Sequence, residues 1–103
     1  MILKTSKDEI NEKLFSDQNL LNDLNGIIFP IGMMHNEDNF NLNSEAIKKL
    51  IYANFISITY TIQKLKKNLI EKKNSCIIGF GSVSGFIGRG INITYAGAKR
   101  GLE

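Results

Sequence analysis

Two short apolar runs on either side of a long helical pattern constrain the fold of this chain most strongly. The runs span Gly26–Gly32 and Cys76–Phe80. Continuous apolar runs of this length are typical of strands that are buried on both faces of a parallel sheet. Between them, apolar residues recur mainly at three- and four-residue steps, which is typical of an amphipathic helix: Ile47, Leu50, Ile51, Ile58, Ile62, Leu65 and Leu69.

The flanking segments extend the same alternation. We expect Met1–Leu3 to be the tail of a strand and the capping box Ser6–Glu9 to begin a helix. The polar stretch Asp17–Asn25 is interpreted as the end of that helix and a loop. After a glycine-rich loop over Gly79–Gly90, Asn92–Leu102 is predicted to begin another helix. The order of strands and helices predicts an α/β fold with βαβ crossovers and a parallel sheet.

Length and composition limit the class of protein. The 103 residues allow one small domain, and 43% hydrophobic with 22% charged residues is ordinary for a globular protein. No apolar run approaches the roughly 18 residues of a membrane span, and the N-terminus does not resemble a signal peptide. The only cysteine, Cys76, forms neither an internal disulfide nor a zinc site by itself, and we interpret it as a small core residue. We expect a cytoplasmic location.

The formal net charge of +3 does not by itself indicate a nucleic-acid partner. Cations are favourable near the negative end of a helix dipole. The densest basic cluster stands at the end of the long helical pattern, and we interpret it as a solvated helix end: Lys64, Lys66, Lys67, Lys72 and Lys73. We therefore expect no nucleic-acid binding.

Tyr95 and Lys99 are the residues most suggestive of chemistry. They are four positions apart, so on a helix their side chains share one face. A free tyrosine titrates near 10, and a neighbouring ammonium favours the phenolate that proton transfer requires. Ser82 follows the predicted strand Cys76–Phe80, 13 residues before Tyr95, where its hydroxyl could hold a substrate oxygen. A Tyr-x-x-x-Lys pair alone is weak evidence, because this spacing often arises by chance.

The surrounding motifs make the pair specific. The stretch Ile77–Gly88, with Ser82 inside it, followed by Tyr95-Ala96-Gly97-Ala98-Lys99, resembles the active-site segment of short-chain dehydrogenase/reductases. Asn54, 28 residues before Ser82, matches the asparagine that this family carries in its long helix. The family's Asn-Asn-Ala-Gly motif is only partly kept. Phe29-Pro30-Ile31-Gly32 stands in its place, with the glycine at the expected 22 residues before Asn54.

This resemblance implies a reaction and a role for each residue. The reaction is hydride transfer between a nicotinamide cofactor, NAD(P)H, and a small carbonyl or alcohol substrate. Tyr95 would be the general acid/base, and Lys99 would bind the nicotinamide ribose and favour the tyrosine phenolate. Ser82 would orient the substrate oxygen. Asn54 would interrupt regular hydrogen bonding in its helix and hold a water of the proton relay. Gly32 would approach the cofactor beside Tyr95 and Lys99.

The resemblance covers only the middle of the family's doubly wound, Rossmann-like fold. Nothing in the sequence matches the Thr-Gly-x-x-x-Gly-x-Gly loop or the family's last strand and substrate-covering segment. We therefore interpret residues 1–103 as a partial dinucleotide-binding domain, a fragment that lacks the first βαβ unit and the C-terminal segment. Alone, it is expected to be neither stable nor active. The complete enzyme is expected to be a homo-oligomer, a dimer or tetramer, in which the long helix contacts a second subunit.

Two further interpretations stay open. Gly88-Arg89-Gly90 with Asn92 resembles family members near surface-polysaccharide genes, which implies a keto-sugar or polyprenyl-linked sugar substrate. The altered motif Phe29-Pro30-Ile31 leaves room for a non-catalytic relative that keeps the fold, or for a truncated product without its own function. The only histidine, His35, is interpreted as a plain loop residue.

Overall fold

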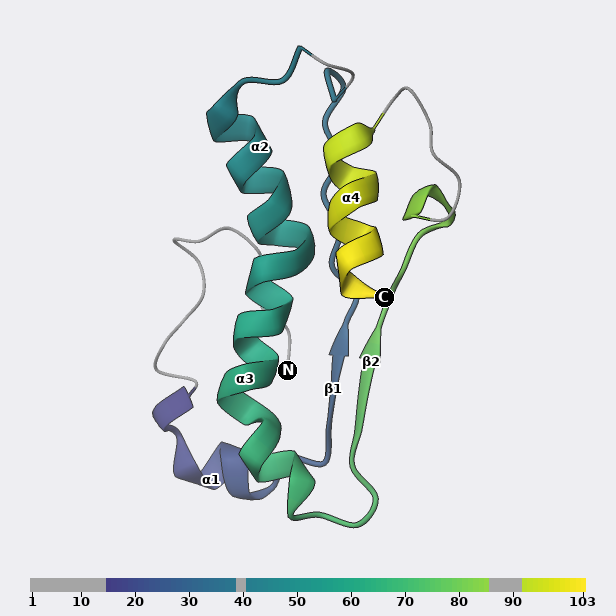
Figure 1. The fold of residues 1–103 in the computed structure, drawn as a ribbon. Helices are drawn as coiled ribbons and strands as arrows, with labels where there is room; N and C mark the ends of the chain where they lie inside the picture. Colours follow the sequence, from purple (N-terminus) through teal and green to yellow (C-terminus); the bar gives the residue numbers. More distant parts are fainter. Residues whose placement is uncertain (1–14, 39–40, 86–91) are drawn as a thin grey trace.

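The computed structural model describes residues 15–38, 41–85 and 92–103. It is an α/β arrangement in which a π-helical turn, Tyr52–Ile56, joins two helices into one long rod (Figure 1). A 3-10 turn, Val83–Gly85, follows the second strand. The helices and strands are α1 (Gln18–Asn22), β1 (Gly26–Phe29), α2 (Ser44–Ile51), α3 (Ser57–Ile70), β2 (Cys76–Gly79) and α4 (Ile93–Leu102).

The two strands pair in parallel, with Gly26 opposite Cys76 and Phe29 opposite Gly79. They point the same way in Figure 1, and the α2–α3 rod forms the crossover between them. The predicted parallel α/β class is confirmed. The expected strand Met1–Leu3 and the helix start at Ser6 lie outside the described residues.

Aspartate and asparagine side chains begin the first two helices. The Asn43 carboxamide oxygen accepts a hydrogen bond from the Ala46 backbone N–H at 2.9 Å, which caps α2. Asp17 caps α1 in the same way through the Leu20 N–H at 3.2 Å. The prediction of a helix end and loop over Asp17–Asn25 was wrong, because Asp17 begins a short helix of its own whose Leu21 is buried.

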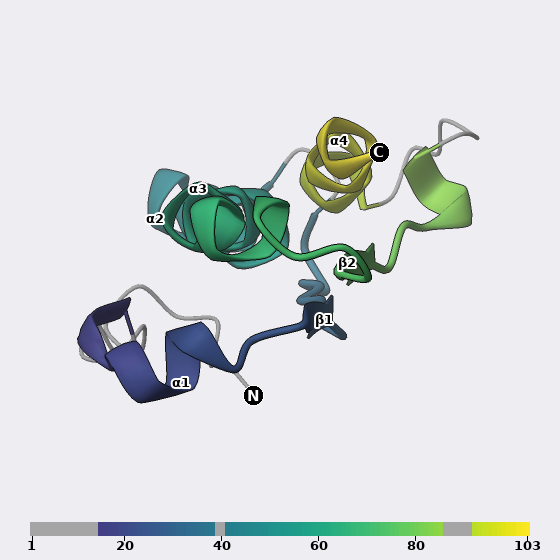
Figure 2. The ribbon, with the colours of Figure 1, turned by 90° about the horizontal axis from the view of Figure 1, so that it is seen from below.

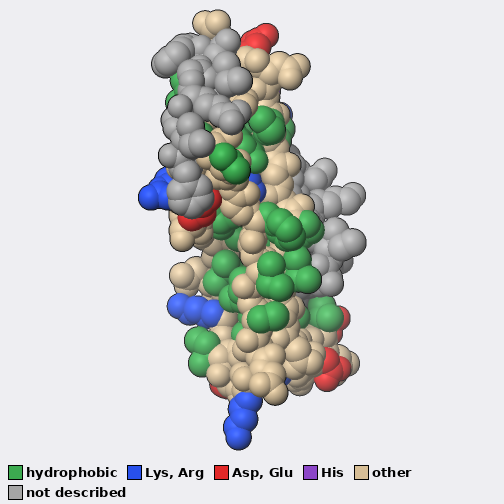
Figure 3. Space-filling model, turned by 90° about the vertical axis from the view of Figure 1, so that its right-hand side faces the viewer, with side chains coloured by type: hydrophobic (Ala, Val, Ile, Leu, Met, Phe, Trp, Pro, Cys, Tyr) green, Lys and Arg blue, Asp and Glu red, His purple; other side chains and the backbone are tan. Residues whose placement is uncertain are grey.

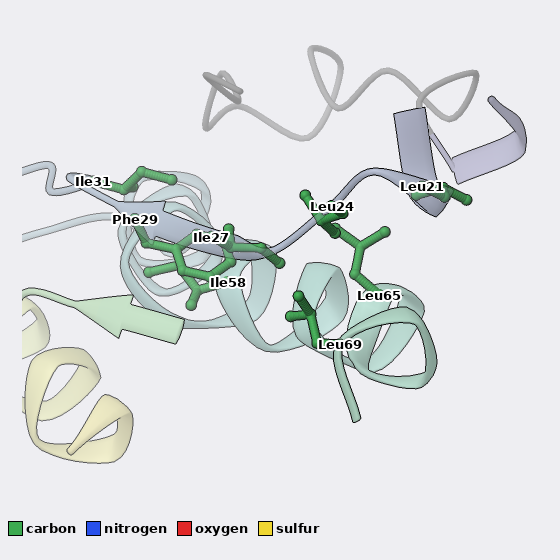
Figure 4. Packing of buried hydrophobic residues seen from close by; sticks show 8 residues of the cluster. All are labelled: Leu21, Leu24, Ile27, Phe29, Ile31, Ile58, Leu65 and Leu69. Atoms are coloured by element: carbon green, nitrogen blue, oxygen red, sulfur yellow. The ribbon is translucent and has the colours of Figure 1, made fainter. Parts of the chain in front are cut away.

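The hydrophobic core lies between β1 and α3 (Figure 4). Ile27 and Phe29 project from one face of β1 toward α3, where Ile58 is 1% exposed. Residues flanking β1 complete the cluster of Leu21, Leu24, Ile27, Phe29, Ile31, Ile58, Leu65 and Leu69. Burial of each such side chain contributes about 1.5–3 kcal/mol to folding.

Lys72 departs from the solvated helix end that the sequence predicted. Its half-buried side chain donates hydrogen bonds to the backbone oxygens of Asn22 and Leu24. The ammonium therefore ties the chain that follows α3 to the segment between α1 and β1. Its neighbours Lys66 and Lys67 are exposed, as expected.

The second face of the sheet is bare. In Figure 2, α3 and α4 lie on one side of the strands. On the other side Ile28 is 54% exposed and its register partner Ile78 is 44% exposed. Apolar side chains gather along the side of the molecule where β2 runs (Figure 3). The predictions of strands buried on both faces and of a buried Cys76 were wrong, since no element among the described residues covers this face.

Candidate active site

The predicted site residues lie at the carboxyl ends of β1 and β2. Ligands of open parallel sheets bind at this end of the strands. Here α4 packs against α2 and the π-helical turn, beside the chain that leaves β1 (Figure 1). The site is thus built from three elements that are far apart in the sequence.

Asn54 joins the long helix to the loop after β1. Its side chain is fully buried, and Nδ2 donates to the backbone oxygens of Leu50 at 2.9 Å and Met33 at 2.7 Å. Its Oδ1 accepts from the Met33 N–H at 3.0 Å. The residue lies in the π-helical turn, where the Ser57 N–H bonds to the Tyr52 oxygen, five positions back. Regular helical hydrogen bonding is therefore interrupted at Asn54, as the family resemblance implied.

Lys99 holds the ends of the two strands together. Its side chain is 2% exposed, and Nζ donates to the backbone oxygens of Ile31 and Phe80, both at 2.8 Å. Burial lowers the pKa of Lys99, because removal from water disfavours the charged form. The two carbonyl oxygens satisfy two of the three ammonium donors. Lys99 is thus fixed by the backbone that follows both strands.

Tyr95 stands one helical turn before Lys99 on α4. Its side chain is half-buried, and the Lys99 ammonium lies 6.0 Å from the centre of its ring. This is the outer range of a cation–π contact. The arrangement places a positive charge beside the phenol, as the shared helix face predicted.

Gly32 passes directly over Asn54 and Lys99. A β-carbon at this position would lie 3.6 Å from Lys99 Nζ and 3.7 Å from Asn54 Oδ1, which are ordinary contact distances. Gly32 itself is exposed. The structure therefore brings Gly32, Asn54 and Lys99 together.

Ser82 lies on the chain after β2. Its Oγ accepts a hydrogen bond from the Ser84 N–H at 3.2 Å, and its N–H donates to Glu103 Oε1 at 3.3 Å. Within the described residues no hydrogen bond joins Ser82 to Tyr95. The connection between them includes residues 86–91, which lie outside the description, so their cooperation stays a prediction.

Asp38 is a site residue that the sequence did not indicate. It is 3% exposed and lies in the loop after β1. Its carboxylate accepts hydrogen bonds from the Thr94 and Tyr95 N–H groups, each at 2.9 Å. Burial alone would raise the pKa of Asp38, but these backbone hydrogen bonds outweigh it and lower the pKa. The only sequence signal was an acidic residue in a polar loop, 57 positions before Tyr95.

The fold and site together define a class of protein. A parallel α/β sheet with a buried polar cluster beyond its strand ends is typical of nucleotide-binding α/β domains. In the part of the chain that is described, no cluster of ligating side chains suits a metal ion. No helix there is long and apolar enough to cross a membrane.

Comparison with known proteins assigns the family. A family model described as short chain dehydrogenase matches residues 5–103. The chain belongs to the short-chain dehydrogenase family, which confirms the family that the sequence resembled. No curated protein matched the chain.

Solved structures of this fold are similar to the chain. A 4-hydroxyisoleucine dehydrogenase mutant complexed with NADH and succinate has a TM-score of 0.81 and 24% identity over 97% of this chain and 42% of its own. A short-chain dehydrogenase family protein from Francisella tularensis subsp. tularensis SCHU S4 has a TM-score of 0.78 and 23% identity, covering 99% and 41%. A bulky-bulky ketone specific alcohol dehydrogenase from Comamonas testosteroni has a TM-score of 0.73 and 19% identity, covering 89% and 39%. The chain thus spans about two fifths of their length.

Proposed function

We propose that this chain carries the proton-transfer part of a nicotinamide-dependent oxidoreductase that interconverts a carbonyl and an alcohol. The observation that carries the proposal is the buried Lys99 ammonium, held 6.0 Å from the Tyr95 ring by backbone oxygens beyond both strands. When a hydride adds to a carbonyl carbon, the oxygen must gain a proton. The Tyr95 phenol donates that proton, and the ammonium stabilises the phenolate left behind.

The residues present fit a nicotinamide cofactor. Gly32 offers exposed backbone without a side chain above Asn54 and Lys99, and a β-carbon would occupy that approach. Lys99 keeps one ammonium donor beyond the two that bind Ile31 and Phe80, and this donor suits a ribose hydroxyl. Gly32, Tyr95 and Lys99 would hold the cofactor, which supplies the hydride when bound.

Asn54 and Ser82 complete the proposed proton path. Both amide protons of Asn54 are used by Leu50 and Met33, whereas within the described part of the chain its Oδ1 accepts one hydrogen bond, from the Met33 N–H. The second lone pair of Oδ1 is therefore available to a relay water. The Ser82 hydroxyl, on the chain after β2, orients the substrate oxygen.

The substrate class belongs to the same proposal. Gly88-Arg89-Gly90, with Asn92, supports a keto-sugar by its resemblance to family members near surface-polysaccharide genes. Only Asn92 of these lies in the described part of the chain. Comparing nucleotide-linked keto-sugars with acyl-thioester ketones as substrates of the full gene product tests this. Turnover of the thioesters alone would overturn the keto-sugar assignment.

Replacing Tyr95 tests the proposed chemistry. In the full gene product, Tyr95→Phe should lower kcat by at least about a hundredfold, because general acid catalysis typically contributes this much. Cofactor affinity, measured by quenching or calorimetry, should fall much less than kcat, because Gly32 and Lys99 still hold the cofactor. Tyr60→Phe is the matched control. Tyr60 lies on α3 and packs edge-on against the ring of Phe15, with 5.9 Å between the ring centres. Turnover retained in Tyr95→Phe would reject the role of Tyr95.

A second candidate function rests on the altered motif. Phe29 and Ile31 are 1% and 8% exposed and belong to the core, so they offer a cofactor no polar side chain. A non-catalytic relative would bind NADH or NADPH without turnover of any carbonyl. Finding that behaviour in the unaltered full gene product would favour this alternative.

A further inference from the structure

The first turn of α4 is capped by a residue from a distant loop. The residue that precedes the helix, Asn92, has φ 60° and ψ 39° and makes no capping hydrogen bond with its side chain. Asp38 takes that place. Its two carboxylate oxygens accept from the Thr94 and Tyr95 N–H groups, and its backbone oxygen accepts from the Ile93 N–H at 3.1 Å. One buried residue thus binds three successive N–H groups that a helix start leaves without partners.

The loop that carries Asp38 is itself anchored to the site. The Ile31 oxygen accepts from Lys99, and both backbone groups of Met33 bond to Asn54. Asp38 makes the next connection, to α4. The loop is therefore held to the strand ends, to the long helix and to the start of α4 by side chains from the site.

Tyr95 and Lys99 depend on different anchors although they share a helix. Lys99 lies in the second half of α4 and is fixed by the oxygens of Ile31 and Phe80. Tyr95 is the third residue of α4, within the turn that frays when its N–H groups lose their acceptors. The Ile93, Thr94 and Tyr95 N–H groups of that turn are bound by Asp38, because the Asn92 side chain makes no capping hydrogen bond.

We propose that Asp38 is a positioning residue that fixes the first turn of α4 and thereby holds the Tyr95 phenol beside Lys99. The proposal rests on the proposed function of Tyr95. A carboxylate suits this place better than a neutral acceptor, because the start of a helix carries partial positive charge. Asparagine would keep one of the two side-chain acceptors and lose the charge, whereas alanine would lose both.

The test uses Asp38→Ala and Asp38→Asn in the full gene product, with Asp17→Ala as the matched control. Asp17 also caps a helix through its carboxylate, but α1 carries no proposed site residue. Amide hydrogen exchange is measured at residues 93–95, across α1 and across α3. Asp38→Ala should speed exchange at 94 and 95 by about tenfold, which corresponds to the loss of a typical cap. Asp17→Ala should affect α1 alone.

Kinetics supply the second measurement. Asp38→Ala should lower kcat by about 10- to 100-fold, because misplacement of a catalytic group by about 1 Å has effects of this size. The KM for the carbonyl should change much less, and Asp38→Asn should recover part of kcat.

Three results separate the hypotheses. An unchanged exchange rate at 94 and 95 in Asp38→Ala, or an equal rise across α3, would overturn the positioning role. A selective rise in exchange with unaltered kcat would also overturn it. If the unaltered protein shows no nicotinamide-dependent turnover, the proposed function fails, and the exchange pattern still decides whether Asp38 holds the Tyr95 turn.

Discussion

At the scale of single residues, buried polar side chains fall into two groups. Ser57 and Thr61 bond to backbone oxygens four positions earlier in their own helix. Asp38, Asn54 and Lys99 bond to backbone of other elements, and Asn54 bonds in addition to the Leu50 oxygen of its own helix. A buried polar group without a partner costs about 1–3 kcal/mol, so each of the second group keeps two elements in a fixed relation. All three gather at the carboxyl ends of the strands, where the site is proposed.

Acid should weaken the hold of Asp38 on α4. Its pKa in the folded state lies below the ordinary value of 3.8, so the carboxylate contributes stability that is fully present above that value. The contribution is lost as pH falls through the lowered, folded-state pKa. The nearby His35 acts in the same direction when it is charged. In urea denaturation at decreasing pH, the free energy of unfolding of the unaltered full gene product should fall more steeply than that of its Asp38→Asn variant. Parallel curves for the two proteins would contradict this.

At the scale of elements, the π-helical turn links the long helix to the loop after β1. It lies between two regular helices, and Asn54 within it reaches the backbone of both Leu50 and Met33. Single π turns inside helices are often found at functional sites. Without this side chain, the Met33 N–H and oxygen would lose their partner on the helix. The π-helical turn therefore fixes the loop after β1, which also contains Gly32 and Asp38.

Substitution of Asn54 should destabilise the protein through this link. Asn54→Ala leaves the buried Leu50 oxygen and the part-buried N–H and oxygen of Met33 without their side-chain partner, and we expect a loss of about 3 kcal/mol. Asn54→Asp keeps the acceptor for the Met33 N–H but places a negative charge beside two carbonyl oxygens. The matched control is Asn43→Ala, an exposed cap of α2, with an expected loss of about 1 kcal/mol. Chemical denaturation of the full gene product measures the loss of stability in Asn54→Ala and in Asn43→Ala. Equal losses would contradict the proposed role of Asn54 in joining the long helix to the loop after β1.

At the scale of the whole molecule, the chain is open on one side. Its radius of gyration is 15.1 Å, against about 13 Å for a compact domain of this length. Ile28, Ile78 and Phe80 are between 44% and 54% exposed on or beyond the sheet. Exposed apolar strands of this kind promote association. The molecule as described thus has a core on one face of its sheet only.

The 103-residue chain alone should therefore be prone to self-association and should unfold with little cooperativity. We expect it to bind an apolar dye such as anilinonaphthalene sulfonate and to lack a sharp melting transition. Ile78→Lys should reduce dye binding, because it places a charge on the bare face. Ile70→Lys, at the end of α3 where Ile70 is 76% exposed, is the control and should leave dye binding unchanged. A cooperative melt with nicotinamide-dependent turnover would contradict this expectation.

Sequence reasoning predicted the elements better than their surroundings. The apolar runs at β1 and β2 and the long helix were confirmed, because spacing of apolar residues reflects local geometry. The prediction that Cys76 is buried was wrong, because burial depends on which other element covers a strand. The helix that Asp17 begins was missed, since a polar segment becomes a helix here by packing Leu21 into the core.

The site divides in the same way. The sequence predicted that Tyr95 and Lys99 share a helix face, and the family resemblance implied that Asn54 and Ser82 belong to the same site. The part played by Ser82 stays a prediction. Only the tertiary structure decided that Lys99 is buried between two strand ends, that Asn54 binds the loop after β1, and that Asp38 caps α4. Helical spacing is a short-range property of neighbouring residues. The partners of a buried charge come from segments that lie tens of residues away in the chain. A local sequence pattern therefore cannot identify them.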